Sequence, residues 1–209
     1  PEYQIDEDFQ GFRTLHSLAY QTLRNKMKLI DDDQAQAFDP NIRIERSRLV
    51  EDDPSSDVSR IKQIVIDTAN TARSTLTSFE DHLRNHLSLS DSYRLNQWLG
   101  YPSKICEKPI NKNDIPRLVH YNNLFEEYKK SLSVIDYTSI LEKGTEQDTS
   151  IPTYEIVFID EAQDLSKLQW AFAEKIFDKA KKVYLAGDDD QAICESFGAS
   201  AETFLAYNA

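Results

Sequence analysis

The sequence predicts an α/β protein, in which a parallel sheet is interrupted by an inserted α-helical region. Two apolar runs, residues 156–159 and 183–186, lack polar alternation, which is typical of strands buried on both faces of a parallel sheet. Between them, residues 166–177 carry apolar side chains at helical spacing. Strand, helix and strand form a βαβ unit, and such a crossover places the two strands parallel to each other.

Both apolar runs end abruptly in carboxylates: Asp160 and Glu161 follow the first, and Asp188 follows the second. In a βαβ unit these ends share one edge of the sheet, where open α/β sheets bind ligands. Neighbouring strands lie about 4.8 Å apart, and two like charges at ~4 Å repel by roughly 1 kcal/mol in water and more at a shielded site. Mg²⁺ would offset this repulsion, since it binds one or two carboxylates with water and phosphate. The alternative is two acidic turns on a solvated surface; the pairing of the two blocks favours the metal.

Three segments resemble motifs of one family. Residues 159–164 (Ile-Asp-Glu-Ala-Gln-Asp) and 187–193 (Gly-Asp-Asp-Asp-Gln-Ala-Ile) resemble the second and third motifs of superfamily 1 UvrD/Rep-like DNA helicases. Residues 14–20 (Thr-Leu-His-Ser-Leu-Ala-Tyr) resemble the family's segment that touches single-stranded DNA, and residues 135–141 resemble the short helix before the second motif. The resemblance implies a partial RecA-like P-loop NTPase sheet and a helicase that uses ATP and Mg²⁺ to move along single-stranded DNA.

The resemblance also implies roles for single residues. Asp160 would hold Mg²⁺ through water, and Glu161 would orient and deprotonate the water that attacks the γ-phosphate. Gln191 would sense that phosphate and link hydrolysis to the grip on DNA. These residue types suit phosphoryl transfer, which needs mainly positioning and charge neutralisation. The residues that would couple the metal site to neighbouring motifs are Gln163, Asp164 and Asp188, and those that would contact DNA are Thr14, His16 and Phe197.

The sequence departs from the family pattern in two places. After Gln191 the family usually has aromatic residues and an arginine, whereas this chain has Cys194, Ser196 and Phe197; Phe197 could stack on a base or pack in the core. A nucleotide site also needs a Gly-x-x-x-x-Gly-Lys-Ser/Thr loop, and none of the five glycines lies in one. With Pro1 in place of Met and no later arginine-bearing motifs, we expect a piece of a longer helicase that hydrolyses ATP poorly alone.

Composition limits the class of protein. The 209 residues, 40% hydrophobic and 11% aromatic, suit one or two compact domains and argue against disorder. No apolar run has membrane-spanning length, no signal peptide is visible, and the two cysteines are isolated, so a reducing cytoplasm is expected. The net charge of −12 would repel DNA phosphates. This chain alone should therefore bind DNA weakly, with the remaining helicase domains supplying most of the grip.

We expect three segments along the chain. A strand near residues 12–14 and a helix should begin the motor domain, one long amphipathic helix should cover residues 61–87, and another helix should follow Pro116. Gly144 and Pro152 should bracket a polar linker. The segments are residues 1–28 (first part of the motor domain), 29–149 (inserted helical subdomain) and 150–209 (second part of the motor domain, with both acidic motifs).

Two other functions fit parts of the sequence. A non-enzymatic helicase-like module could bind a protein partner through the helical insertion. A metal-dependent nuclease could use Asp160, Glu161 and residues 188–190, but Gln191 and the segment at residues 14–20 give it no support.

Overall fold

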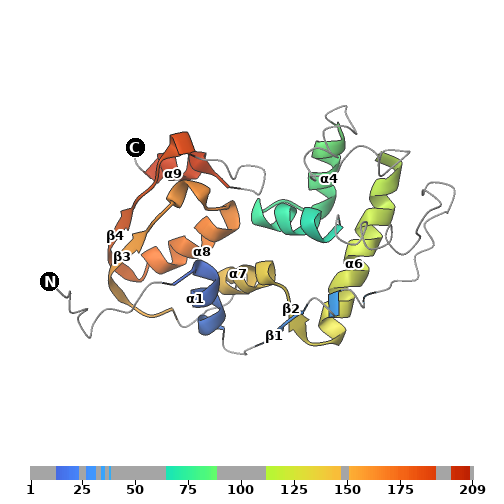
Figure 1. Ribbon diagram of the computed structural model, residues 1–209, viewed down its shortest axis with the longest axis horizontal. Coiled ribbons are helices and arrows are strands. Elements are labelled where there is room, and N and C mark those ends of the chain that lie inside the picture. Colours follow the sequence, from blue (N-terminus) through green and yellow to red (C-terminus); the bar gives the residue numbers. More distant parts are fainter. Residues whose placement is uncertain are drawn as a thin grey trace.

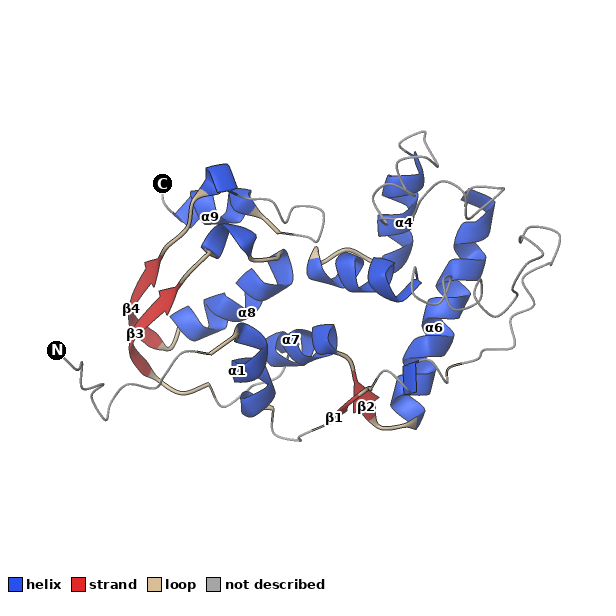
Figure 2. Ribbon diagram, viewed as in Figure 1, coloured by secondary structure: helices blue, strands red, loops and turns tan. Residues whose placement is uncertain are grey.

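The computed structural model describes eight stretches of the chain, and its elements form two groups (Figures 1 and 2). One group contains the strands β3 and β4 with the helices α1, α7, α8 and α9; the other contains α4, α6 and an unlabelled helix at residues 65–74. The described residues are 13–23, 27–31, 34–35, 38, 65–88, 112–146, 151–191 and 199–207.

The βαβ unit predicted near the C-terminus is present. Strands β3 (Tyr154–Ile159) and β4 (Ala180–Leu185) pair in parallel, and α8 (Lys167–Phe177) connects them. Helix α8 begins at a capping box, in which Ser166 and Gln169 exchange side-chain and backbone hydrogen bonds. Such a box satisfies two amide groups that the first helical turn leaves without partners.

The prediction that both strands are buried on both faces is wrong. Phe158 is 74% exposed, and Ile156 and Tyr184 are about half exposed; the rings of Phe158 and Tyr184 stack at 4.9 Å. Alternate residues of a strand point to opposite faces, and Val157 packs on the core cluster beneath α8. The described helices α1, α7 and α8 lie on one side of the two strands (Figure 1). Within the described part of the chain, no helix covers the apolar residues on the other side of the strands.

Helices α1 (Leu15–Thr22) and α7 (Tyr137–Glu146) pack with α8 around one core. The Thr14 hydroxyl accepts a hydrogen bond from the Ser17 amide at 3.1 Å and caps α1, which a threonine at this position favours. Residues 13–14 therefore lead into the helix and form no strand; residue 12 lies outside the described stretches. The buried cluster consists of Ala19, Leu23, Ile135, Ile140, Leu141, Leu168, Phe172 and Ile176.

Gly144 does not open a linker, as the sequence suggested, but lies inside α7 and is buried. A Cβ at this position would lie 2.9 Å from the ring of Phe172 and 3.3 Å from the Cβ of Ala19. The glycine therefore lets α7 approach α1 and α8 closely.

We expect Gly144→Ala to lower the free energy of unfolding by about 1–3 kcal/mol, the usual cost of overpacking a core. Urea unfolding followed by circular dichroism measures this difference. Glu146→Ala is the matched control, since it adds alanine to the exposed end of the same helix and should leave stability nearly unchanged. Equal stability of the Gly144→Ala variant and the parent chain would contradict the close packing.

The single long helix predicted over residues 61–87 is wrong within its described part. The structure has helix 65–74, a turn, and then α4 (Phe79–Ser88). At the turn Leu76 has φ 57°, and the Thr77 amide donates to the Ala72 carbonyl at 2.9 Å. This is the Schellman arrangement that ends many helices.

The polar residues of this turn explain why the apolar periodicity did not predict the break between the two helices. The Thr75 hydroxyl donates to the carbonyls of Thr71 and Ala72, and the Ser78 hydroxyl accepts from the Asp81 amide at 3.0 Å, which caps α4. Hydroxyl side chains compete in this way with the helical backbone pattern. The apolar spacing thus continues across a break that local hydrogen bonds impose.

Helix α6 (Ile115–Ser131) confirms the prediction of a helix after Pro116, with Pro116 in its first turn. It leads into β2 (Val134–Ile135), which pairs in parallel with β1 (Lys28–Leu29). Helix α9 (Ala201–Tyr207) packs Phe204 against Trp170 of α8. The core of the helical region consists of Phe38, Val65, Leu83, Ile115, Leu118, Tyr121 and Phe125.

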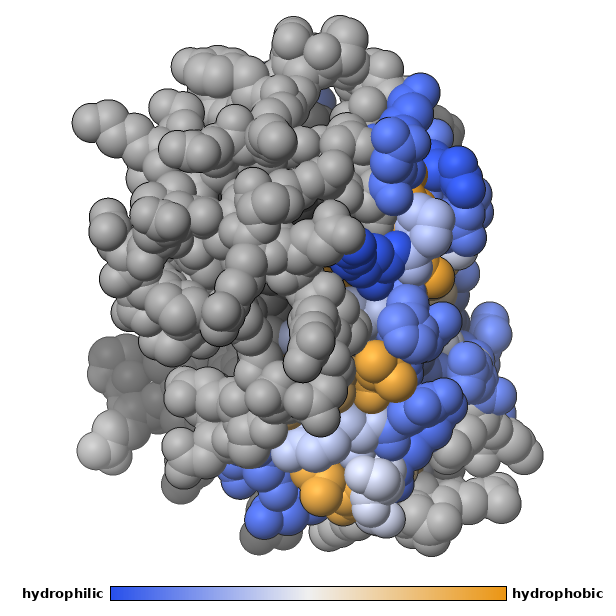
Figure 3. Space-filling model, turned by 90° about the vertical axis from the view of Figure 1, so that its right-hand side faces the viewer, coloured by the Kyte–Doolittle hydropathy of each residue, from blue (hydrophilic) through white to orange (hydrophobic). Residues whose placement is uncertain are grey.

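The surface that Figure 3 turns toward the viewer is mainly hydrophilic where residues are described, with small separate hydrophobic patches. This agrees with the high charge of the chain. Within the described stretches, no helix combines the length and apolar character needed to cross a membrane.

Candidate functional site

The acidic ends of β3 and β4 meet at one edge of the sheet, as the sequence predicts. The Ala186 amide donates to the Ile159 carbonyl at 2.8 Å, and the Ala162 amide donates to the Ala186 carbonyl at 2.9 Å. These bonds extend the parallel pairing past the strands. Two short 3₁₀ helices follow at this edge: η3 (Ala162–Asp164) after β3 and η4 (Asp189–Gln191) after β4.

Gln163 joins the two acidic segments. Its side chain is almost fully buried, at 1% exposure, although glutamine is usually exposed. Its Oε1 accepts from the Asp188 amide at 3.0 Å, and its Nε2 donates to Oε2 of Glu161 at 2.8 Å. A buried amide satisfied at both ends fixes the relative position of the groups it binds.

Gly187 makes room for this bridge. A Cβ on Gly187 would lie 2.4 Å from Oε1 of Gln163, which is far inside van der Waals contact. The glycine before Asp188 therefore leaves the space that the Gln163 side chain occupies.

Glu161 has an unusual backbone, with φ 52° and ψ 41°, in the left-handed region that residues other than glycine seldom adopt. The Asp160 carboxylate accepts a hydrogen bond from the Glu161 amide at 3.1 Å. Such conformations cost about 1–3 kcal/mol and cluster at functional sites. The turn directs the Glu161 carboxylate to Gln163.

Gln191 is held on Asp188 and not on Glu161. Its Nε2 donates to Oδ2 of Asp188 at 2.5 Å, and Oδ1 of Asp188 accepts from the Asp190 amide at 3.1 Å. Asp188 therefore contacts two residues of η4 with its side chain and Gln163 with its backbone.

The described residues contain no group of three or more histidine, cysteine, aspartate or glutamate side chains arranged to hold a metal ion. Asp160, Glu161 and Asp188 lie at one edge of the sheet, but their side chains do not form a preformed metal-binding site. All three are exposed. This donor set fits Mg²⁺, which is usually held by one or two carboxylates and completes its shell with water and phosphate.

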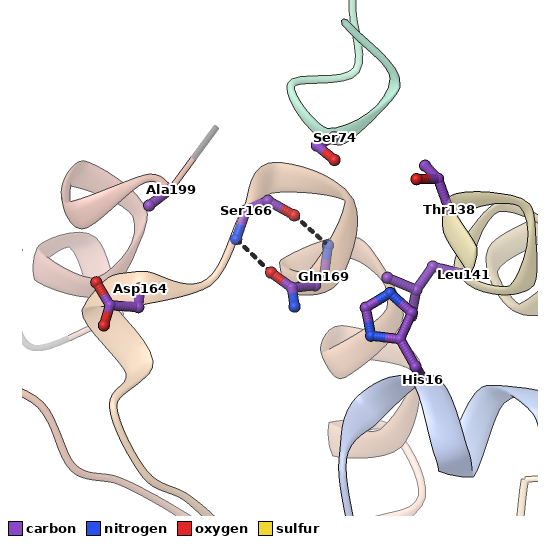
Figure 4. A pocket seen from close by; sticks show the side chains of 8 residues that line it. All are labelled: His16, Ser74, Thr138, Leu141, Asp164, Ser166, Gln169 and Ala199. Carbon is purple, nitrogen blue, oxygen red and sulfur yellow. Dashed lines mark hydrogen bonds between the residues drawn. The ribbon is translucent and has the colours of Figure 1, made fainter. Parts of the chain in front are cut away.

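Asp164 and His16 line a second feature, a pocket of about 250 Å³ (Figure 4). Oδ1 of Asp164 is buried, and no donor among the described residues reaches it. Burial lowers the pKa of His16 below its usual 6.5, because the charged imidazolium is disfavoured away from water. The other residues of the wall are Ser74, Thr138, Leu141, Ser166, Gln169 and Ala199.

Tyr137, which the sequence did not single out, stacks on His16 with ring centroids 4.4 Å apart and remains 59% exposed. The two rings come from the first turns of α7 and α1. The helical periodicity of a sequence does not indicate which residue an aromatic side chain at a helix start will contact. The Tyr137–His16 pair therefore becomes visible only in the packing of α7 on α1. Of the predicted DNA contacts, His16 thus lies at the pocket, Thr14 is engaged in capping, and Phe197 lies outside the described residues.

Parallel strands joined by a crossover helix, with carboxylates at their shared edge, define an α/β protein of the class that binds ligands at that edge. The family model described as the UvrD/REP helicase N-terminal domain matches residues 10–209. The chain therefore belongs to the UvrD/Rep helicase family, which implies an ATP-dependent DNA helicase function. None of the curated proteins matches the chain.

Proposed function

We propose that this chain is the N-terminal motor region, without the phosphate-cradling glycine loop, of a helicase that couples ATP hydrolysis to movement along single-stranded DNA. The observation that carries this proposal is the bridge made by Gln163, which ties the Glu161 carboxylate to the backbone of Asp188. A rigid link of this kind between the two acidic segments suits a site in which hydrolysis at one is sensed at the other.

In the proposed reaction Asp160 would hold a Mg²⁺ ion, which would neutralise charge on the phosphate oxygens. Glu161 takes a proton from the attacking water. Because Gln163 occupies Oε2 of Glu161, we assign this proton to Oε1. Gln191, whose Nε2 donates to Asp188, is proposed to sense the γ-phosphate once ATP is bound.

The isolated chain is proposed to hydrolyse ATP poorly. None of its five glycines lies in a Gly-x-x-x-x-Gly-Lys-Ser/Thr loop, and Gly144 and Gly187 have packing roles. Without the backbone amides of that loop, the triphosphate lacks its main cradle. A loop of this type encoded elsewhere in the complete gene would support the motor, whereas its absence there would support the non-enzymatic module.

The three segments at residues 1–28, 29–149 and 150–209 remain our proposed division into a motor domain and a helical insertion. Helix α7 lies in the second segment and packs against α1 and α8 of the other two. It thus connects the second segment with the other two.

Single-stranded DNA is proposed to bind beside the pocket, with a base on the exposed ring of Tyr137. A stacked base contributes about 1–3 kcal/mol, so Tyr137→Ala should weaken binding of a labelled oligothymidylate by roughly tenfold, measured by fluorescence anisotropy at low salt. Tyr184→Ala is the matched control, since Tyr184 is also about half exposed and stacked on an aromatic ring. Equal losses of DNA affinity in both variants would contradict a DNA site at α7.

A further inference from the structure

A buried group of charges lies where helix 65–74 and α6 meet the start of α7. Asp136 immediately precedes α7, and its Oδ1 accepts from the Ser139 amide at 2.8 Å, capping the helix. Its Oδ2 pairs with Arg73 of helix 65–74 at 2.7 Å and with Lys129 of α6. One carboxylate therefore ties together three helices.

Arg73 extends this contact along α7. Its Nη1 donates to Ser139 Oγ at 3.0 Å and to the Glu142 carboxylate at 3.1 Å. Asn70, one turn earlier, accepts from Arg73 and from the Thr138 hydroxyl. The contacts of Arg73 and Asn70 with the first two turns of α7 are thus all polar.

The burial of these charges makes a purely stabilising role a weak explanation. The side chains of Asp136, Arg73 and Lys129 are 14%, 19% and 3% exposed. Burial by itself would raise the pKa of Asp136, but Arg73 and Lys129 outweigh it and hold that pKa well below its usual range. Buried ion pairs often add little net stability over apolar packing, and fixing a relative position is one reason to retain them.

The buried charged residues are next in sequence to residues at the pocket. Tyr137, which stacks on His16, is the residue after Asp136. Thr138 and Ser74, which line the pocket, follow Tyr137 and Arg73. Helix 65–74 therefore contributes Ser74 to the lining of the pocket, and helix 65–74 and α6 supply the two cations that hold the start of α7.

We propose that Asp136, with Arg73 and Lys129, is a positioning joint that sets Tyr137 against His16 and makes DNA binding at this face depend on docking of the helical region. The claim about DNA rests on the proposed function, whereas the claim about ring geometry does not. Asp136 acts through Tyr137 and does not itself contact DNA.

The deciding variant is Asp136→Asn in the full 209-residue chain. It removes one negative charge, so electrostatics alone would tighten DNA binding. The joint predicts the opposite: about tenfold weaker binding of a labelled oligothymidylate, equivalent to loss of one stacking contact. Glu80→Gln is the control, because it removes one negative charge from the exposed Glu80–Arg84 pair of α4; it should leave binding equal or slightly tighter. Tighter binding by the Asp136→Asn variant would overturn the proposal for DNA.

A second readout tests the ring geometry without DNA. The Cε1–H signal of His16, assigned with a His16→Gln variant, should shift in Asp136→Asn, and the His16 pKa should rise toward 6.5. Arg73→Lys keeps the charge but loses the forked contacts, so it should give the same change and serves if Asp136→Asn unfolds, as judged by circular dichroism. An unchanged His16 signal and pKa in the folded variants would overturn the joint. Failure of the unaltered chain to bind DNA, with the His16 changes present, would reject the DNA site proposed at Tyr137 and retain the joint.

Discussion

Replacing Glu161 with glutamine is expected to slow ATP hydrolysis by the complete gene product about 10²–10⁴-fold, the usual contribution of a general base. Glutamine has nearly the same shape and can still accept the hydrogen bond from Nε2 of Gln163, but it cannot take a proton from water. ATP should therefore remain bound while turnover is lost. Phosphate release at saturating Mg²⁺ and ATP, beside direct measurement of nucleotide binding, separates the two steps.

Glu155→Gln is the matched control for this variant. It makes the same chemical change on β3, where Glu155 is exposed and pairs with Lys181 at 2.6 Å, far from the carboxyl end of the strand. Its turnover should equal that of the unaltered protein. A Glu161→Gln variant that also kept its turnover would assign the base to another residue.

Gly187→Ala is expected to reduce hydrolysis by about 10²-fold, because small displacements of a catalytic group can cost this much. The added Cβ would lie 2.4 Å from Oε1 of Gln163 and 3.1 Å from the ring of Phe204. Gln163 would have to leave its place, and with it the hydrogen bonds to the Asp188 amide and to Glu161 would be lost. The turnover number should fall more than nucleotide affinity.

The bridge can be isolated by a double-mutant cycle with Gln163→Ala. If Gly187→Ala acts by displacing Gln163, adding it to Gln163→Ala should cost little more than Gln163→Ala alone. Circular dichroism of each variant controls for folding, since Phe204 belongs to a buried cluster. Fully additive losses would show that Gly187 acts through some other contact.

The sequence predicted those features that depend on neighbours along the chain. Uniform apolar runs marked β3 and β4, and helical spacing marked α8 and α6. Sequence order alone then placed the carboxylates at one edge, because a crossover makes the strands parallel. The resemblance to helicase motifs identified the residues there, whose roles remain predictions.

Features that depend on distant neighbours were missed. Gly144 reads as a break in sequence, but it is a contact point between α7 and Phe172. The exposed face of Phe158 has the same apolar pattern as the buried face, so the pattern could not distinguish them. The break after helix 65–74 depends on hydroxyl groups that compete for backbone carbonyls, and these do not disturb apolar periodicity.

The charge group around Asp136 shows the same limit for polar residues. Arg73 lies 63 residues from Asp136 in the sequence, and the packing of helix 65–74 on α7 brings the two charges together. The net charge of −12 predicted weak DNA binding but gave no sign of which charges are buried. Likewise, the stacking of Tyr137 on His16 follows from the packing of α7 on α1.

The most direct test of the proposed motor is phosphate release from ATP by the complete gene product, measured with and without single-stranded DNA. We expect turnover that DNA stimulates and that the Glu161→Gln substitution strongly reduces. Absence of hydrolysis under both conditions, in a folded protein, would contradict the motor and favour a helicase-like module that binds a protein partner.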